Sequence, residues 1–280
     1  MTSQSPVQEQ SNAGQSSILK GKRAVIFGAG GSIGSAVARE FAAEGADVYL
    51  AGRSKSNVED VTNQIIAAGG RAHSKVIDAL DDAAVNEYID SVVKETGTID
   101  VVFNAVGPLA SEYGNGKRAV DLPIEEFMVP LTTVVKSHFI TARAAARHML
   151  KQRAGVIIFV TGSPARGHVE GATAIGSAFG AIESLMENLA VELGSAGVRV
   201  VCLRTTANVD SRTIQDTVTA IATKMKIPKE SSVERIANLN FLKVPAHTSD
   251  TAKAAAFLAS DRARMMTGTV VNSTAGAALD

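Results

Sequence analysis

The stretch Ile26-Phe27-Gly28-Ala29-Gly30-Gly31-Ser32-Ile33-Gly34 decides how this chain folds. It continues a short apolar run, Ala24–Phe27, that is typical of a buried strand, and it leads into an Ala-rich segment, Ser35–Glu44, that is typical of a helix. Glycines between a strand and a helix allow a sharp turn and a close approach to a pyrophosphate, whose charge the helix N-terminus stabilises. A plain turn is the alternative, but the flanking elements favour nucleotide binding.

Strand-like runs alternate with helical patterns along the chain, which predicts a parallel sheet with helices on both faces. We expect a single α/β domain built on a doubly wound Rossmann-type sheet of about seven strands. The strands are expected at Ala24–Phe27, Val48–Ala51, His73–Ile77, Val101–Asn104, Val156–Thr161, Val198–Leu203 and Thr269–Asn272. The helices are expected at Ser35–Glu44, Val58–Ala68, Ala83–Thr96, Glu125–Leu150, Ile175–Ser195 and Thr251–Ser260, with an interruption or an entry at Pro130.

Two segments depart from this alternation. Residues 1–18 are rich in Ser and Gln and lack the apolar core of a signal peptide, so we expect a disordered tail. Residues 19–280 then form the dinucleotide-binding and substrate domain. Within that domain, residues 206–245 are polar and mixed, with helical patches, and we expect them to form a mobile lid over the pocket.

The composition argues against several classes of function. Lys+Arg and Asp+Glu number 28 each, so no overall field attracts nucleic acid or an acidic membrane. No apolar run reaches membrane-spanning length. The single cysteine, Cys202, lies in an apolar run, which excludes a disulfide framework and favours a buried small side chain. No metal site is predicted, because ligand spacing is absent from His73, His138, His148 and His247. We expect a reduced, cytoplasmic protein.

The residues that close the second expected strand bear on the choice of cofactor. An NAD enzyme needs a carboxylate here to accept hydrogen bonds from the ribose hydroxyls, and that carboxylate repels a 2′-phosphate. This chain has Gly52, Arg53 and Ser54 instead, and the arginine fork suits a phosphate. A solvated surface arginine is the alternative, but it leaves the missing carboxylate unexplained. The predicted cofactor is therefore NADP(H).

In their order along the chain, these motifs resemble those of the short-chain dehydrogenase/reductase family over residues 20–276. The family's Gly-x-x-x-Gly-x-Gly loop is matched at Gly28 and Gly34, with Ser32 in place of the middle glycine. Segments similar to the family's adenine-binding Asp and its Asn-Asn-Ala-Gly motif follow the third and fourth strands, at the edge where open α/β sheets bind ligands. The resemblance implies a cofactor site made of Gly28, Gly31, Ser32, Ile33, Gly34, Arg53, Ser54, Asp78, Ala79, Asn104, Ala105 and Gly107.

The resemblance also implies a catalytic group of Asn, Ser, Tyr and Lys, from which this chain departs. In working members the Tyr protonates the substrate carbonyl while hydride arrives from nicotinamide, and the Lys lowers the pKa of that phenol. The Ser orients the substrate, and the Asn completes a proton relay. None of the side chains at these positions in this chain can exchange a proton at neutral pH. In the order Asn, Ser, Tyr, Lys, the aligned residues are Val134, Gly162, Ile175 and Phe179.

Substitutes for the missing groups are sought in the loops after the fourth and fifth strands. Tyr113 and Lys117 have the Tyr-x-x-x-Lys spacing, but two glycines between them favour a flexible loop over a helix. His168 can donate a proton near neutral pH, with a solvated loop histidine as the alternative. Arg166 stays protonated and can only polarise or anchor a substrate. Two hydroxyls without an evident base flank the Ser position, those of Thr161 and Ser163.

Two hypotheses of function follow. The first is an NADP(H)-dependent oxidoreductase with an atypical active site, acting on a small, apolar substrate. The alternative is a catalytically silent NADP-binding homologue that acts as a sensor, scaffold or partner subunit. The family resemblance implies a homotetramer or a homodimer in either case, and no nucleic-acid or membrane partner is expected.

Overall fold

Seven parallel strands form one continuous sheet in the computed structural model, which describes residues 17–166 and 169–280. The strands lie in the order β3-β2-β1-β4-β5-β6-β7, which confirms the predicted doubly wound Rossmann-type fold. The order reverses between β1 and β4, the kind of switch point at which open α/β sheets bind ligands. The strands are β1 (Arg23–Phe27), β2 (Asp47–Gly52), β3 (Arg71–Val76), β4 (Val101–Asn104), β5 (Gly155–Gly162), β6 (Val198–Thr205) and β7 (Thr269–Ser273).

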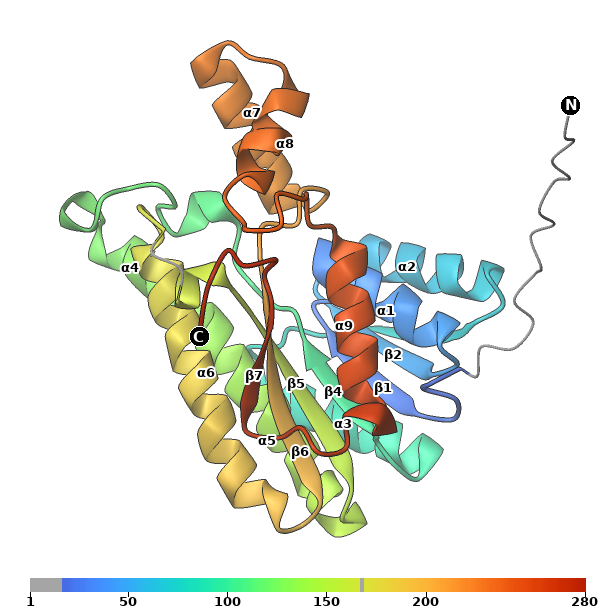
Figure 1. The fold of residues 1–280 in the computed structure, drawn as a ribbon. Coiled ribbons are helices and arrows are strands. Elements are labelled where there is room, and N and C mark those ends of the chain that lie inside the picture. The colour runs from blue at the N-terminus through green and yellow to red at the C-terminus, as the bar shows by residue number, and fades with distance from the viewer. Residues whose placement is uncertain (1–16, 167–168) are drawn as a thin grey trace, which may run out of the picture.

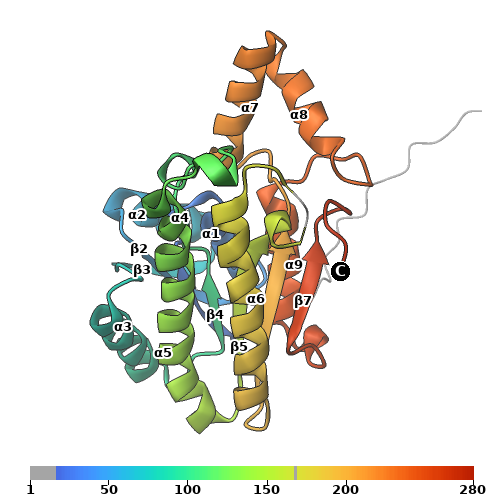
Figure 2. The same cartoon turned by 90° about the vertical axis from the view of Figure 1, so that its left-hand side faces the viewer.

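Helices cover both faces of the sheet (Figure 1, Figure 2). The buried apolar residues on the two faces form two separate clusters, as expected when helices pack on both sides. Phe41 and Phe103 meet edge to face in one cluster, and Phe27 and Tyr88 do so in the other. The first face carries α1 (Ser32–Ala43), α2 (Lys55–Ala67) and α9 (Thr248–Ala259), and the second carries α3 (Asp82–Thr96), α5 (Lys136–Gln152) and α6 (Thr173–Gly194).

The predicted N-terminal tail, residues 1–18, falls largely outside the described residues, which begin at residue 17. The backbone N–H of Ile18 donates to the carboxylate of Glu44 at 3.0 Å. Leu19, the next residue, is fully buried in the cluster beneath α1. The packed body of the protein therefore includes the last residue assigned to the tail.

Helix α1 begins three residues earlier than the sequence pattern indicated, at Ser32 instead of Ser35. Gly31 has an extended backbone (φ −86°, ψ 169°), and the helix starts directly after it. The first turn belongs to the glycine loop and carries little of the apolar pattern by which a helix is recognised. As a result, the first amides of α1 lie directly at the carboxyl end of β1.

The helical patches expected in the predicted lid, residues 206–245, are two regular helices. Helices α7 (Arg212–Met225) and α8 (Lys229–Ala237) form a hairpin that stands above the carboxyl ends of the strands (Figure 1, Figure 2). A parallel bridge between Asn208 and Ala246 joins the two ends of this segment at its base. The segment thus leaves the sheet and returns to it at one place.

The long helical stretch predicted over residues 125–150 is divided at Pro130. Helix α4 (Ile124–Pro130) ends at the proline, a π-helical turn follows over Leu131–Val135, and α5 continues from there. A proline inside a helix lacks the N–H for the regular hydrogen bond, and wider π turns take up such interruptions.

A buried ion pair joins α6 to β6. The guanidinium of Arg204, only 1% exposed, donates to both carboxylate oxygens of Glu183 at 2.8 and 2.9 Å. The hydroxyl of Thr161 donates to the same carboxylate at 3.2 Å, and Arg204 also contacts Asp280. Both buried charges are therefore compensated, and removing either partner would leave the other with only a partly exposed second partner, Asp280 for Arg204 and Arg166 for Glu183.

We predict that Arg204→Met lowers the free energy of unfolding by about 3–5 kcal/mol, because Glu183 then loses its buried cation and has only the exposed Arg166 nearby. The double variant Arg204→Met/Glu183→Met should recover most of that loss. Urea denaturation measures both. The matched control is Lys22→Met, which removes the cation of an exposed pair with Asp261 and should cost under about 1 kcal/mol. Equal losses for the two single variants would contradict the prediction.

Candidate cofactor and substrate site

Backbone hydrogen bonds hold the ends of four neighbouring strands in line at the carboxyl edge of the sheet. The cofactor residues expected from the sequence directly follow β1, β2, β3 and β4, so the structure brings them to this one edge. The bonds run from the N–H groups of Ile77, Ala29 and Ala105 to the carbonyls of Gly52, Ala51 and Phe27, over 3.1, 3.1 and 3.0 Å.

The glycine loop packs so tightly that two of its positions exclude any side chain. Gly28 has φ +74°, and a Cβ there would lie 2.8 Å from the carbonyl carbon of Ala105. A Cβ on Gly34 would lie 2.3 Å from the carbonyl oxygen of Gly28. The N–H groups of Ser32, Ile33 and Gly34 donate to no acceptor among the described residues. A backbone cradle with free amides at a helix start fits a pyrophosphate.

Arg53 lies where the sequence analysis expected it, directly after β2. Its side chain is exposed and forms no ion pair with any residue that the structure describes. The neighbouring Ser54 caps α2 by accepting the N–H of Asn57 at 3.4 Å. A free guanidinium at this edge is suited to a phosphate carried on the adenosine ribose.

The residues after β3 and β4 have different surroundings. Asp78 is exposed, and its carboxylate accepts the N–H of Leu80 at 3.0 Å. Asn104 is buried: its amide donates to the hydroxyl of Thr141 at 2.9 Å, and its oxygen accepts the N–H of Val106 at 2.8 Å. The Asn104 side chain therefore fixes the end of β4 against α5.

The four residues aligned with the catalytic group come together on the α6 side of the sheet. Ile175 and Phe179 lie one turn apart on α6, and a Cβ on Gly162, at the end of β5, would lie 3.0 Å from the Phe179 ring. Val134, in the π-helical turn, is buried in the same apolar cluster as Ile175, and Phe179 packs against that cluster. The place where β5, α6 and the π turn meet is therefore apolar.

The hydroxyls on either side of Gly162 are both buried and both hydrogen-bonded. Thr161 donates to Glu183, and Ser163 donates to the hydroxyl of Thr206 at 3.1 Å. Neither hydroxyl lies beside a base that would activate it as a nucleophile, since the Glu183 carboxylate is neutralised by Arg204.

The loops after β4 and β5 meet at two glycines, where the N–H of Gly116 donates to the carbonyl of Gly171 at 2.9 Å. Tyr113 lies in the first loop, outside any helix, and burial raises the pKa of its phenol. The Lys117 ammonium lies 2.7 Å from each carboxylate oxygen of Glu126. Tyr113 and Lys117 therefore do not form a helical Tyr-x-x-x-Lys pair.

Of the two other loop candidates, Arg166 and His168, the structure describes Arg166. Arg166 is exposed, and its Nε lies 3.5 Å from the Glu183 carboxylate, so it extends toward the buried ion pair. His168 lies outside the described residues.

The structure also identifies buried polar residues that the sequence analysis did not assign to the site. His138 is fully buried, its Nδ1 lies 2.8 Å from the Val134 carbonyl, and burial lowers its pKa to about 4, so the ring is neutral. Glu183 and Arg204 are charges within apolar runs, which is the signal that could have revealed them. Burial raises the pKa of the Cys202 thiol to about 12, which agrees with a buried, unreactive cysteine.

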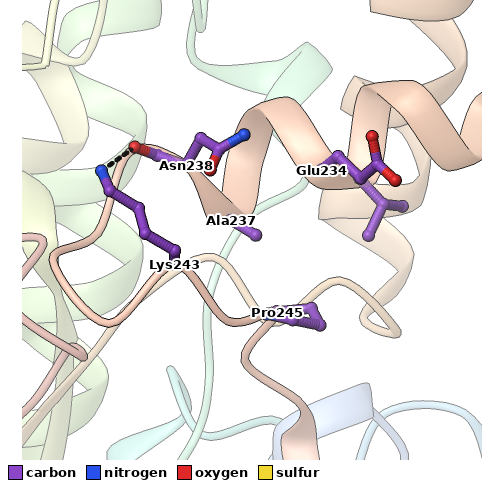
Figure 3. Close-up of a pocket in the computed structure, with 6 residues that line it drawn as sticks. Glu234, Ala237, Asn238, Lys243 and Pro245 are labelled. Atoms are coloured by element: carbon purple, nitrogen blue, oxygen red, sulfur yellow. Dashed lines mark hydrogen bonds between the residues drawn. The ribbon is translucent and has the colours of Figure 1, made fainter.

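A pocket of about 290 Å³ lies in the lid, on α8 and the turn that follows it (Figure 3). Lys243 crosses its edge and donates to the carbonyl of Asn238 at 2.6 Å. None of the predicted site residues lines it; the lining residues are Val233, Glu234, Ala237, Asn238, Lys243 and Pro245. Residues 17–166 and 169–280 contain no cluster of metal-ligating side chains, and no helix among them is long and apolar enough to cross a membrane.

Comparisons with known proteins agree with this geometry. A family model described as enoyl-(acyl carrier protein) reductase matches residues 28–278. The 7alpha-hydroxysteroid dehydrogenase of Escherichia coli (strain K12) is 29% identical over 182 residues, covering 65% of this chain and 69% of that protein. The structure of an NAD⁺-bound xylitol dehydrogenase superposes with a TM-score of 0.82 at 25% identity, over 91% of this chain and 98% of that one. An actinorhodin polyketide ketoreductase with NADPH has the same fold, with a TM-score of 0.83 at 19% identity over 91% and 97% of the two chains.

We predict that Gly34→Ala weakens dinucleotide binding and lowers stability by about 1–3 kcal/mol, because the new methyl group overlaps the Gly28 carbonyl. Fluorescence titration with NADPH and NADH, beside thermal unfolding, measures both effects. The control is Gly180→Ala, in α6, where a Cβ meets nothing within 4 Å; this change should leave binding intact and raise stability by up to about 1 kcal/mol. Unchanged binding in Gly34→Ala would show that the loop does not contact the dinucleotide.

Proposed function

We propose that this chain, which belongs to the short-chain dehydrogenase/reductase family of oxidoreductases, is an NADP(H)-dependent enzyme with an atypical active site. Family membership accounts for the oxidoreductase class and for a nicotinamide cofactor. The choice of NADP(H) and the unusual proton chemistry are proposals that rest on particular residues. Both proposals rest on one contrast. At one end of the site the glycine loop forms a backbone cradle, and at the other end Val134, Ile175 and Phe179 are apolar.

The preference for NADP(H) is supported by Arg53 and by the absence of a carboxylate at the neighbouring Gly52. Gly52 ends β2 where an NAD enzyme needs a carboxylate, and Arg53 follows with an exposed guanidinium that has no ion pair among the described residues. A guanidinium makes charge-assisted, often bidentate, hydrogen bonds to phosphate. The two similar structures contain NAD⁺ in one case and NADPH in the other, so the choice depends on the residues of this chain.

In the proposed reaction, one end of the site would bind the cofactor and the other end would bind the substrate. The bound nicotinamide would supply or accept the hydride. The glycine loop and the free amides of α1 would hold the pyrophosphate, and Arg53 would hold the 2′-phosphate. Val134, Ile175 and Phe179 would exclude water and favour a small apolar substrate.

The proton would come from a residue outside the positions used by other family members. The side chains at the four aligned positions carry no titratable group. We place the donor in the loops after β4 and β5, which the Gly116–Gly171 hydrogen bond joins. The candidates are Tyr113, which has the family's usual donor chemistry on another element, and His168, whose intrinsic pKa suits a general acid. We also expect a homotetramer or homodimer, by family likeness.

We predict that Arg53→Ala weakens NADPH binding by about 1–3 kcal/mol and leaves NADH binding unchanged, because only NADPH has the 2′-phosphate. Calorimetric titration of each cofactor gives the affinities. Arg71→Ala, an exposed arginine on the neighbouring β3, serves as the control and should change neither affinity. If the unmodified protein bound NADPH and NADH equally well, the cofactor proposal would be wrong.

We predict different pH–rate profiles for the two donors, measured on a substrate found by screening apolar carbonyl compounds for NADPH oxidation. A general acid must be protonated, so a rate that depends on His168 falls as pH rises through about 6–7. A rate that depends on Tyr113 holds through neutral pH and falls only above the phenol's usual pKa, because burial raises that pKa. Whichever residue is the donor, its substitution (Tyr113→Phe or His168→Ala) should remove the fall in rate that is attributed to that residue. Full rates in both variants would exclude both loops as the source of the proton.

A further inference from the structure

The start of helix α7 contacts the glycine loop from the opposite end of the chain. The backbone N–H of Arg212 donates to the hydroxyl of Ser32 at 3.1 Å. Ser32 is the first residue of α1 and Arg212 the first residue of α7, so the N-terminal ends of two helices meet at one hydroxyl. The contact puts the first turn of the lid beside the free amides of α1.

Hydrogen bonds to the segment that begins α9 hold the start of α7 in this place. Asn208, just before it, forms the bridge to Ala246 and accepts the hydroxyl of Thr251 at 3.1 Å. The Asp210 carboxylate accepts both the N–H and the hydroxyl of Thr248, at 2.8 and 2.7 Å. These bonds tie the segment to the first turn of α9, which packs beside α1. Arg212 therefore begins from a fixed backbone position.

The electrostatic surroundings of this position favour an anion. Neither α1 nor α7 has a side-chain cap or an acidic residue in its first turn, whereas Ser54 caps α2 and Asp81 caps α3. The Arg212 side chain is exposed, and it forms no hydrogen bond or ion pair with any part of the chain that the structure describes. The free Arg212 side chain thus begins where two helix starts with partial positive charge meet, and the nearby Asp210 carboxylate is bound to Thr248.

We infer that Arg212 binds the pyrophosphate of the dinucleotide cofactor and closes the glycine loop from the lid side. The inference rests on the proposed function, since it adds a residue to the same cofactor site. The pyrophosphate carries two negative charges at neutral pH, and Arg53 lies at the ribose edge, where it serves the 2′-phosphate. The hydroxyl of Ser32 accepts from Arg212 and keeps its own proton for a phosphate oxygen.

Three ligands separate the roles of the two arginines. NADPH has both the pyrophosphate and the 2′-phosphate, NADH has only the pyrophosphate, and adenosine 2′-monophosphate has only the 2′-phosphate. Calorimetric titrations of each ligand are compared for the unmodified full chain and for Arg212→Gln, Arg212→Lys and Arg53→Ala. Lys224→Gln, an exposed cation in the last turn of α7, is the matched control. Thermal unfolding checks that each variant is folded.

Arg212→Gln should weaken NADPH and NADH by the same factor, about five- to a hundred-fold for a lost charge-assisted contact, and leave adenosine 2′-monophosphate unchanged. Arg212→Lys should retain most of the affinity, and Lys224→Gln all of it. The inference is overturned if Arg212→Gln binds both dinucleotides normally, if it affects NADPH but not NADH, or if Lys224→Gln gives the same loss. If the unmodified protein binds neither dinucleotide, the proposed function itself fails.

Discussion

The contact between the backbones of Gly28 and Gly34 is the constraint on which the rest of the site depends. A methyl group on Gly34 would come within 2.3 Å of the Gly28 carbonyl oxygen, so the first turn of α1 can lie against the end of β1 only with glycine there. That proximity starts α1 at Ser32 and leaves its first three amides without an acceptor in residues 17–166 and 169–280. It also lets the segment after β4 approach the loop through Ala105. Three elements thereby meet at the topological switch point of the sheet.

The two ends of the site are built from different parts of the chain. The adenosine end is made largely of backbone, held by hydrogen bonds between strand ends, and it needs glycine at only a few positions. The opposite end depends on side chains, and there Val134, Gly162, Ile175 and Phe179 keep the packing without the polar groups. Under the proposed function, substitutions at that end would alter the chemistry while the sheet and helices stay intact. A chain can therefore keep its fold and its cofactor cradle while its proton chemistry changes.

The sequence predicted most of the fold because strands and helices in this chain alternate with clear apolar patterns. All seven strands lie where they were expected, within two residues at either end. The first turn of α1 was missed because loop glycines precede its apolar pattern. Over residues 206–245 the sequence indicated only helical patches, because the polar helices α7 and α8 carry too little apolar pattern to define their bounds. The contact of Arg212 with Ser32 joins residues 180 positions apart, and no local signal encodes it.

The buried ion pair between Arg204 and Glu183 bears on where the proposed proton donor lies. Glu183 is the first ionisable group on α6 after Phe179, and its carboxylate is bound by Arg204 and Thr161. Because both of its oxygens accept hydrogen bonds inside the fold, this carboxylate is not available to a substrate. His138 is neutral and enclosed, and its Nδ1 is bound to the Val134 carbonyl. Glu183 and His138 are thus held within the fold, and for this reason our proposal takes the proton donor from the loops after β4 and β5.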